Sequence, residues 1–289
     1  MPIAIVTAAN DGYFASLQHL IRSLDGINKL GDFTIHVLDV GLTAPQRSTL
    51  TQAGHVILNP GWDVDVSPWK GVPEWFKAMT ARPFLPNYVK NAEVIVWIDA
   101  DIWVQDQTML YDFVRAAQGG SLAVCLELER SYDNMFMRNA SRDVYYNNLS
   151  KYYGEETANR LIHLPMMNCG AFALLPDHPL WALWQSTIKG AITKYCSNFL
   201  EQTALNMAVY SNNIIPHFLP ARHNWMTCHA LPLWDEAAGY FVEPNLPHDK
   251  IGLMHLACGL WKRDDIEYRT TTGNTLQSPL RPKSSAAQA

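Results

Sequence analysis

Residues 94–104 read VIVWIDADIWV, and this stretch decides the fold. Almost every residue in it is apolar, as in a strand buried on both faces, yet Asp99 and Asp101 interrupt it. A buried carboxylate without a partner is costly or loses its charge. We therefore expect the strand to end near Ile98 and the two acids to lie at its mouth, because open α/β sheets bind ligands beyond the carboxyl ends of their strands.

The two acids have the spacing of metal ligands. Alternate residues of an extended segment point the same way, so both carboxylates can converge on one cation. Hard oxygen ligands of this kind suit Mg²⁺ or Mn²⁺. The alternative is that the acids cap a helix after the strand, but Trp103 and Val104 continue the apolar pattern. A second pair, Asp63 and Asp65, lies in the Pro- and Trp-rich loop 59–75, where we expect loop hydrogen bonds or surface charge rather than a metal.

The surrounding chain alternates strands and helices. Apolar runs at 3–9, 33–41 and 55–59 are separated by amphipathic segments at 14–24 and 43–54, which predicts an α/β fold with a mostly parallel sheet between helices. Two further segments are predicted strands, 122–129 and 167–175. Three are predicted helices, 108–120, 178–196 and 201–210. Residues 130–165 are polar and predict irregular structure with a helix or two.

The composition limits the class of function. The chain has 289 residues and a net charge of −5 without a basic stripe, so nucleic-acid binding is not expected. Its five scattered cysteines form no CxxC pair, which is typical of a reduced, intracellular chain. No apolar run approaches the ~20 residues of a membrane helix, and the N-terminus lacks the pattern of a signal peptide. We expect a cytoplasmic protein without an integral membrane segment.

Several motifs in order resemble those of one enzyme family. The segments are IVTAANDGYFASLQHLIRSL, FTIHVLDVGLTAPQRSTL, TARPFLPNYVKNAEVIVWIDADIWV, MNCGAFALL, EQTALN and IGLMHLACGLWK. Together they are similar to glycosyltransferase family 8, the retaining GT-A family of lipopolysaccharide galactosyl- and glucosyltransferases and glycogenin. The resemblance implies one GT-A domain over 1–265, with a nucleotide-sugar-binding half at about 1–125 and an acceptor half at about 126–265. Residues 266–289 are expected to be a loosely ordered tail.

The resemblance also implies a role for particular residues. The metal ligands would be Asp99, Asp101 and His255. The nucleotide-sugar would be bound by Ala8, Asn10, Tyr13, Arg82, Ala100, Gly259 and Lys262. The sugar pocket, with the residues closest to the reaction, would be formed by Asn168, Gly170, Glu201 and Gln202.

Each assignment has a simpler structural alternative. Asn10 is also suited to capping a helix, and Arg82 is also suited to a solvated surface, with Lys77 as the competing cation for the diphosphate. His255 lies in an apolar run and can be a core histidine, and Glu201 can be an acid at a helix N-terminus. A zinc site is a further alternative in one His- and Cys-rich stretch, but its spacing fits no tetrahedral pattern. Its members are His217, His223, Cys228 and His229.

The implied activity is metal-dependent, retaining transfer of a hexose from a UDP-sugar to a carbohydrate or glycoconjugate acceptor, as in polysaccharide biosynthesis. A nucleotide-sugar hydrolase or nucleotidyltransferase on the same fold is one alternative, although residues 7–14 lack the Gly-rich phosphate loop that a nucleotidyltransferase needs. A non-catalytic nucleotide-sugar-binding protein is another. Because Gln202 is a poor nucleophile, retention predicts front-face attack rather than a covalent sugar–enzyme intermediate. For acceptor stacking, the sequence offers Trp225, Trp234 and Tyr240, which are equally suited to a core.

Overall fold

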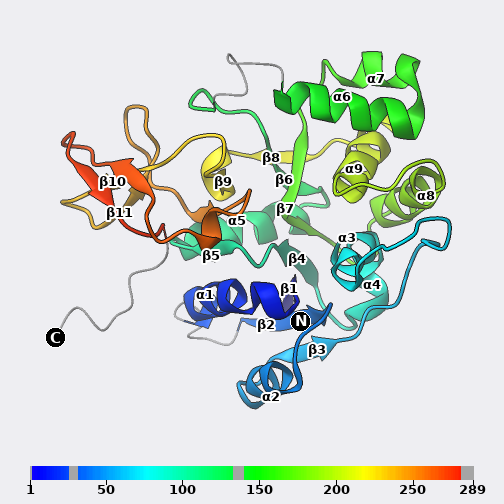
Figure 1. Ribbon diagram of the computed structural model, residues 1–289, viewed down its shortest axis with the longest axis horizontal. Helices are drawn as coiled ribbons and strands as arrows, with labels where there is room; N and C mark the ends of the chain where they lie inside the picture. The colour runs from blue at the N-terminus through cyan, green and yellow to red at the C-terminus, as the bar shows by residue number, and fades with distance from the viewer. Residues whose placement is uncertain (1, 26–31, 133–139, 281–289) are drawn as a thin grey trace.

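A seven-stranded sheet forms the centre of the molecule, with helices on both faces (Figure 1). The computed structural model describes residues 2–25, 32–132 and 140–280. The strand order is β3-β2-β1-β4-β7-β6-β8. The strands are β1 Ile3–Ala9, β2 Phe33–Asp39, β3 Val56–Leu58, β4 Val94–Ile98, β6 Ala123–Leu126, β7 Met167–Leu174 and β8 His217–Leu219. Only β7 runs antiparallel to its two neighbours, so the predicted mostly parallel α/β sheet is confirmed.

The helices cover the sheet because its central strands are apolar on both sides. In β4, Val94, Val96 and Ile98 pack on one face, whereas Ile95 and Trp97 pack on the other. This is the period-2 alternation of a pleated strand buried on both sides. The helices are α1 Phe14–Asp25, α2 Ala44–Gln52, α3 Lys77–Ala81, α4 Leu85–Tyr88, α5 Gln107–Gln118, α6 Ala140–Tyr153, α7 Glu155–Leu161, α8 Leu180–Ile192 and α9 Leu200–Ser211. Helices α1, α2 and α5 pack on the first face, and α3, α4, α8 and α9 pack on the second.

The antiparallel strand β7 brings a distant segment to the carboxyl edge of β4. Ile98, the last residue of β4, is opposite Ala171, and Cys125 of β6 is opposite Asn168. The amino end of β7 therefore lies beside the carboxyl ends of β4 and β6. Loop residues that follow or precede these three strands meet at one edge of the sheet.

A small second sheet returns the C-terminal part of the chain to the same edge. Its strand order is β5-β12-β9, with β5 at Ile102–Val104, β9 at Trp225–Met226 and β12 at Leu253–His255. In this sheet His255 is opposite Ile102 of β5 and Met226 of β9. Two hairpins pack beyond it, β10 Leu233–Asp235 with β11 Tyr240–Val242, and β13 Glu267–Arg269 with β14 Thr275–Gln277.

The described part of the expected C-terminal tail is ordered. Residues 266–280 include the β13–β14 hairpin, and Ile266, Tyr268 and Leu280 are buried against the core of the second sheet. These scattered apolar side chains are too sparse to give a strand signal along the sequence, although together they cover one face. Residues 281–289 of that expected tail lie outside the described residues.

Two other expectations can be compared with the described residues. Trp225 is fully buried, so it belongs to the core and is not available for stacking on an acceptor sugar. Trp234 is half-buried and packs edge-on against Phe241. The polar stretch 130–165 contains α6 and α7, as the predicted helix or two, although 133–139 are outside the described residues. Within the described residues, no helix combines the length and apolar character that crossing a bilayer requires.

Candidate active site

Asp99 and Asp101 lie where the sequence predicted, immediately beyond the carboxyl end of β4. The local geometry differs from the extended segment we expected. Residues 99–101 form a turn, closed by the Ile102 N–H donating to the Asp99 carbonyl oxygen at 3.0 Å. The Asp99 N–H donates to the Gly170 carbonyl oxygen at 2.8 Å, which fixes the turn to β7. The turn, rather than strand alternation, therefore brings the two carboxylates together, and they cap no helix.

His255 completes a cluster with the two acids. Its Nε2 lies 3.5 Å from Oδ1 of Asp101 and 3.9 Å from Oδ2 of Asp99. One potential ligand atom from each of the three residues lies within 4.8 Å of the others. His255 is 5% exposed, which fits both a metal ligand and a core histidine. Its contacts with two carboxylates favour the metal ligand.

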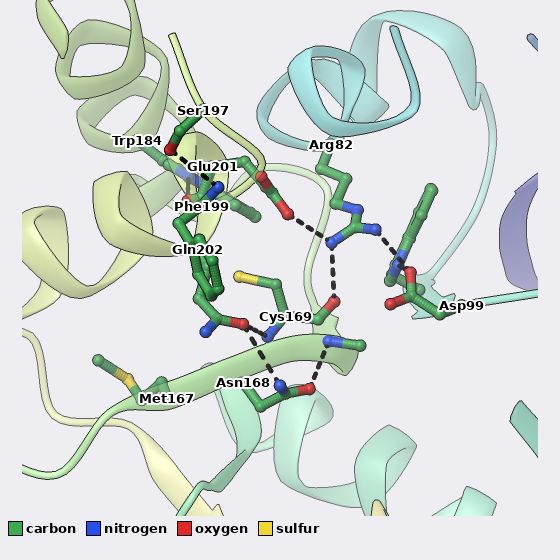
Figure 2. Close-up of polar contacts among 12 residues, drawn as sticks. Arg82, Asp99, Met167, Asn168, Cys169, Trp184, Ser197, Phe199, Glu201 and Gln202 are labelled. Carbon is green, nitrogen blue, oxygen red and sulfur yellow. Dashed lines mark hydrogen bonds and ion pairs between the residues drawn. The ribbon is translucent and has the colours of Figure 1, made fainter. Parts of the chain in front are cut away.

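Arg82 is at the centre of this edge rather than on a solvated surface (Figure 2). Its guanidinium donates to Asp99 Oδ1 at 2.6 Å and to Glu201 Oε1 at 2.9 Å. It also lies over the Trp97 ring, 4.6 Å from the ring centroid. Trp97 Nε1–H donates to the same Asp99 Oδ1 at 2.8 Å. These two donors occupy Oδ1 and leave Oδ2 directed toward His255.

The charges at this edge favour an added cation. Asp99 and Glu201 pair with the Arg82 guanidinium, and a third carboxylate, Asp101, lies nearby at 3.5 Å from His255 Nε2. Burial raises the pKa of Asp99, and the charge of Asp101 raises it further, against the opposing effect of Arg82. Burial also raises the pKa of Glu201. A divalent cation would relieve this excess of negative charge.

The donor atoms fit a divalent metal. Two carboxylates and one imidazole suit Mn²⁺ or Mg²⁺, with Mn²⁺ better matched to the nitrogen. Burial alone would lower the pKa of His255, but the carboxylates of Asp101 and Asp99 outweigh it and raise the pKa. In the doubly protonated ring, the Nε2–H faces these carboxylates and occupies the position that a metal ion would take.

The other ring nitrogen of His255 contacts a residue that the sequence did not identify as part of the metal site. Nδ1 lies 3.0 Å from Oδ1 of Asn224. Asn224 Nδ2 donates to Asn168 Oδ1 at 2.8 Å. No sequence motif reveals this partner, because pairing between β9 and β12 brings it to the site.

The expected sugar-pocket residues form one hydrogen-bonded network (Figure 2). Gln202 Oε1 accepts from the Cys169 N–H at 3.0 Å and from Asn168 Nδ2 at 3.3 Å. Glu127 was missed by sequence reasoning, yet its Oε1 accepts from Asn168 at 2.8 Å and from Gln202 at 3.1 Å. Glu127 is therefore a carboxylate in direct contact with Gln202. In the sequence Glu127 lay within the predicted strand 122–129, whereas in the structure it directly follows β6.

Gly170 is required where β7 passes His255. A Cβ atom added there would lie 2.4 Å from His255 Cε1 and 2.7 Å from Asn168 Oδ1. Such separations are far below van der Waals contact. At this glycine the group that approaches the backbone most closely is the His255 imidazole.

A cavity extends from Asp99 and Asp101 along the ends of β1 and β4. It brings together the residues expected to bind uridine with Arg82 and the two acids. Its lining residues are Ala8, Ala9, Asn10, Tyr13, Val40, Trp75, Ala78, Met79, Arg82, Trp97, Asp99, Ala100 and Asp101. Asn10 also caps the turn Asp11–Tyr13, with its Oδ1 accepting from the Tyr13 N–H at 3.0 Å, so both of its expected roles are compatible.

The two competing lysines lie outside the lining of this cavity. Lys77 Nζ lies 2.5 Å from Glu74 Oε2 and over the Trp62 ring. Lys262 is exposed, at the end of the turn Leu260–Lys262, with its Nζ over the Trp261 ring. Gly259 begins that turn at φ +80°, a left-handed conformation that favours glycine.

The alternative metal sites are not assembled. Asp63 accepts from Tyr88 and Asp65 from the Ser67 N–H, as expected for loop hydrogen bonds. The buried His223 is paired with Asp112 at 2.8 Å. Among the described residues, the Asp99–Asp101–His255 group is the only set of three or more suitable side chains close enough to hold a metal ion, so the proposed zinc stretch forms none there.

Comparison with solved structures places this geometry in a known fold. The galactosyltransferase LgtC, solved with donor and acceptor sugar analogues, superposes with a TM-score of 0.57 over 90% of each chain at 18% identity. Mouse xyloside xylosyltransferase 1 in its apo form gives 0.52 at 12% identity, over 89% of this chain and 98% of that one. The chain has the GT-A fold.

No protein-family profile and no curated protein sequence matches the chain. An active-site mutant of LgtC also superposes, with a TM-score of 0.56 at 16% identity over 90% of each chain. At these identities the comparisons establish the GT-A fold, while the particular reaction must be argued from the residues of this chain.

Proposed function

We propose that this protein transfers a hexose from a UDP-sugar, UDP-glucose or UDP-galactose, to a hydroxyl group of a carbohydrate or glycoconjugate. The observation that carries the proposal is the position of the Asp99–Asp101–His255 cluster at one end of the cavity beside β1. A nucleoside diphosphate in that cavity would place its phosphates against the cluster. Bound Mn²⁺ or Mg²⁺ would neutralise the negative charge of the departing UDP.

The residues around the cavity have separate roles in this proposal. Ala8, Asn10 and Tyr13 line its nucleoside end, and the phenol ring of Tyr13 offers a face for the base. Arg82 holds Asp99 and Glu201 in place while its remaining face lines the cavity. Because Lys77 is paired with Glu74, we propose Lys262 as the additional cation for the diphosphate.

The hexose would lie over the network at the start of β7, where Asn168, Gly170 and Gln202 meet. Gln202 is an amide whose oxygen already accepts two hydrogen bonds, so it supplies no nucleophile. Glu201 is paired with Arg82, and Glu127 Oε1 accepts from two amides. These contacts support front-face attack, in which the acceptor oxygen bonds to the anomeric carbon as the bond to the diphosphate oxygen breaks on the same face. The proton of the acceptor hydroxyl passes to the departing diphosphate oxygen. We propose that about 1–125 form the nucleotide-sugar-binding half and about 126–265 the acceptor-side half, which also supplies the residues beside the hexose.

Calorimetry and thermal unfolding test the donor assignment. UDP should bind, and should raise the melting temperature, only when Mn²⁺ or Mg²⁺ is present, because the diphosphate completes the coordination of the metal. Stabilisation by GDP or CMP but not by UDP would contradict the proposed nucleotide.

Proton NMR of the first product tests the stereochemistry. An α-linked product from an α-linked UDP-sugar supports retention, and a β-linked product overturns it. Mass spectrometry of the protein during turnover should find no glycosyl adduct. An adduct on Glu127 or Glu201 would keep retention and refute front-face attack.

A further inference from the structure

Asn224 joins the metal cluster to the sugar pocket. It is 1% exposed and lies between the turn Ala221–His223 and β9. Parallel pairing of β9 with β12 places the residue after next, Met226, opposite His255. Both ends of the Asn224 amide are hydrogen-bonded to side chains of the site, with Oδ1 to His255 and Nδ2 to Asn168.

One backbone N–H determines how each side-chain amide in this series of hydrogen bonds is oriented. The Gly170 N–H can only donate, and it donates to the Asn168 side-chain oxygen at 2.8 Å. The Asn168 nitrogen is then directed to Glu127, at 2.8 Å. Since the Asn168 oxygen must accept from Asn224, the Asn224 nitrogen faces Asn168 and its oxygen faces His255.

The hydrogen bond to Asn224 determines which nitrogen of the His255 imidazole carries the proton. An amide oxygen at 3.0 Å from Nδ1 requires a proton on that nitrogen. The neutral ring then carries its lone pair on Nε2, the nitrogen that faces Asp99 and Asp101. A ligating histidine is held in this way when its other nitrogen donates to an oxygen.

We propose that Asn224 is the positioning residue that fixes His255 as the Nδ1–H tautomer. The Gly170 N–H orients the amide of Asn168, and Asn168 in turn orients the amide of Asn224. This inference rests on the proposed metal-dependent function and adds a regulatory link to it. A sugar that disturbs Asn168 also disturbs the metal ligand through Asn224. The metal and the hexose are thereby coupled through protein side chains in addition to the donor itself.

The tautomer can be measured without turnover. In the metal-free protein at alkaline pH, nitrogen-15 NMR of His255 should show a protonated Nδ1. Asn224→Ala should allow the Nε2–H form to appear, whereas Asn224→Asp retains an acceptor and should keep Nδ1–H. Asn148→Ala is the matched control, because Asn148 is a buried amide of α6 whose contacts are with Val144 and Ser197.

Manganese affinity, measured by electron paramagnetic resonance, gives a second readout. Loss of a partner that orients a metal-bound histidine typically weakens metal binding by about 10–100-fold. We expect a loss in this range for Asn224→Ala and none for Asn148→Ala. If Asn224→Ala does not fold, Asn168→Ala serves instead, because it releases the Asn224 amide to rotate and should also mix the tautomers.

The outcomes separate the two proposals. A wild-type Nε2–H tautomer, or an unchanged tautomer in the foldable variant, overturns the role of Asn224. A wild-type protein that shows Nδ1–H but binds no Mn²⁺ overturns the proposed metal-dependent function, while the tautomer comparison still decides the positioning role.

Discussion

Replacement of Gly170 by alanine should dismantle the metal site while leaving the fold in place. The added Cβ would lie 2.4 Å from Cε1 and 2.8 Å from Nδ1 of His255. Carbon atoms pack at about 3.5–4.0 Å, so the ring or β7 must retreat by about 1 Å. The retreat is several times the roughly 0.2 Å by which metal–ligand distances vary in proteins.

Gly170→Ala should lower both the folding stability and the affinity for Mn²⁺. Overpacking of this kind costs about 1–3 kcal/mol of folding stability. Misplacing one metal ligand should weaken Mn²⁺ binding by at least the roughly 10–100-fold known for lost ligand-orienting contacts. The second loss is equivalent to about 1.4–2.8 kcal/mol of binding free energy.

Gly190→Ala provides a matched control. Gly190 lies within α8, and a Cβ there would meet nothing within 4 Å. This variant should gain about 0.5–1 kcal/mol, because alanine is the better helix former. Urea unfolding and manganese titration by electron paramagnetic resonance should be run on both variants. Wild-type manganese affinity in a folded Gly170→Ala protein would refute the argument.

Three further predictions concern charge. Asp101→Asn should remove Mn²⁺ binding without unfolding the protein, and Asp65→Asn should leave binding unchanged; equal losses in manganese titrations would refute the assignment. Arg82→Met should destabilise the fold by about 3–5 kcal/mol, because it leaves the buried Glu201 carboxylate unpaired, and a loss below about 1 kcal/mol in urea unfolding would count against that role. Burial lowers the pKa of His223 below its usual 6.5, so the unfolded state binds the proton first and stability should fall as pH drops below about 6.5. His223→Gln, which keeps a donor and cannot titrate in this range, should lose less unfolding free energy between pH 7.5 and 5.5, and an equal loss would contradict this.

The sheet and the position of Asp99 and Asp101 beyond the end of β4 were predictable because their signals are local. The apolar run before Asp99 marks a doubly buried strand, and alternation of strands with helices predicts parallel pairing. The turn at 99–101 was not predictable, because it is fixed by the Gly170 carbonyl oxygen, about seventy residues away along the chain. Local sequence contains no information on that contact.

Residues that act through long-range pairing were harder to identify. Glu127 looks like an ordinary acid within the predicted strand 122–129, and Asn224 lies in a stretch whose histidines drew attention to zinc. Both are defined by neighbours from other strands. The role of Arg82 was suggested by resemblance, but its burial between Asp99 and Glu201 depends on packing that no local pattern describes.

The most direct test of the central claim is release of UDP from UDP-glucose and UDP-galactose by the purified protein. We predict release that stops when EDTA removes divalent metal, resumes with Mn²⁺, and is absent in Asp101→Asn. Release that continues in EDTA, or that survives Asp101→Asn at the wild-type rate, would contradict the claim that Asp99, Asp101 and His255 hold the metal that activates the donor.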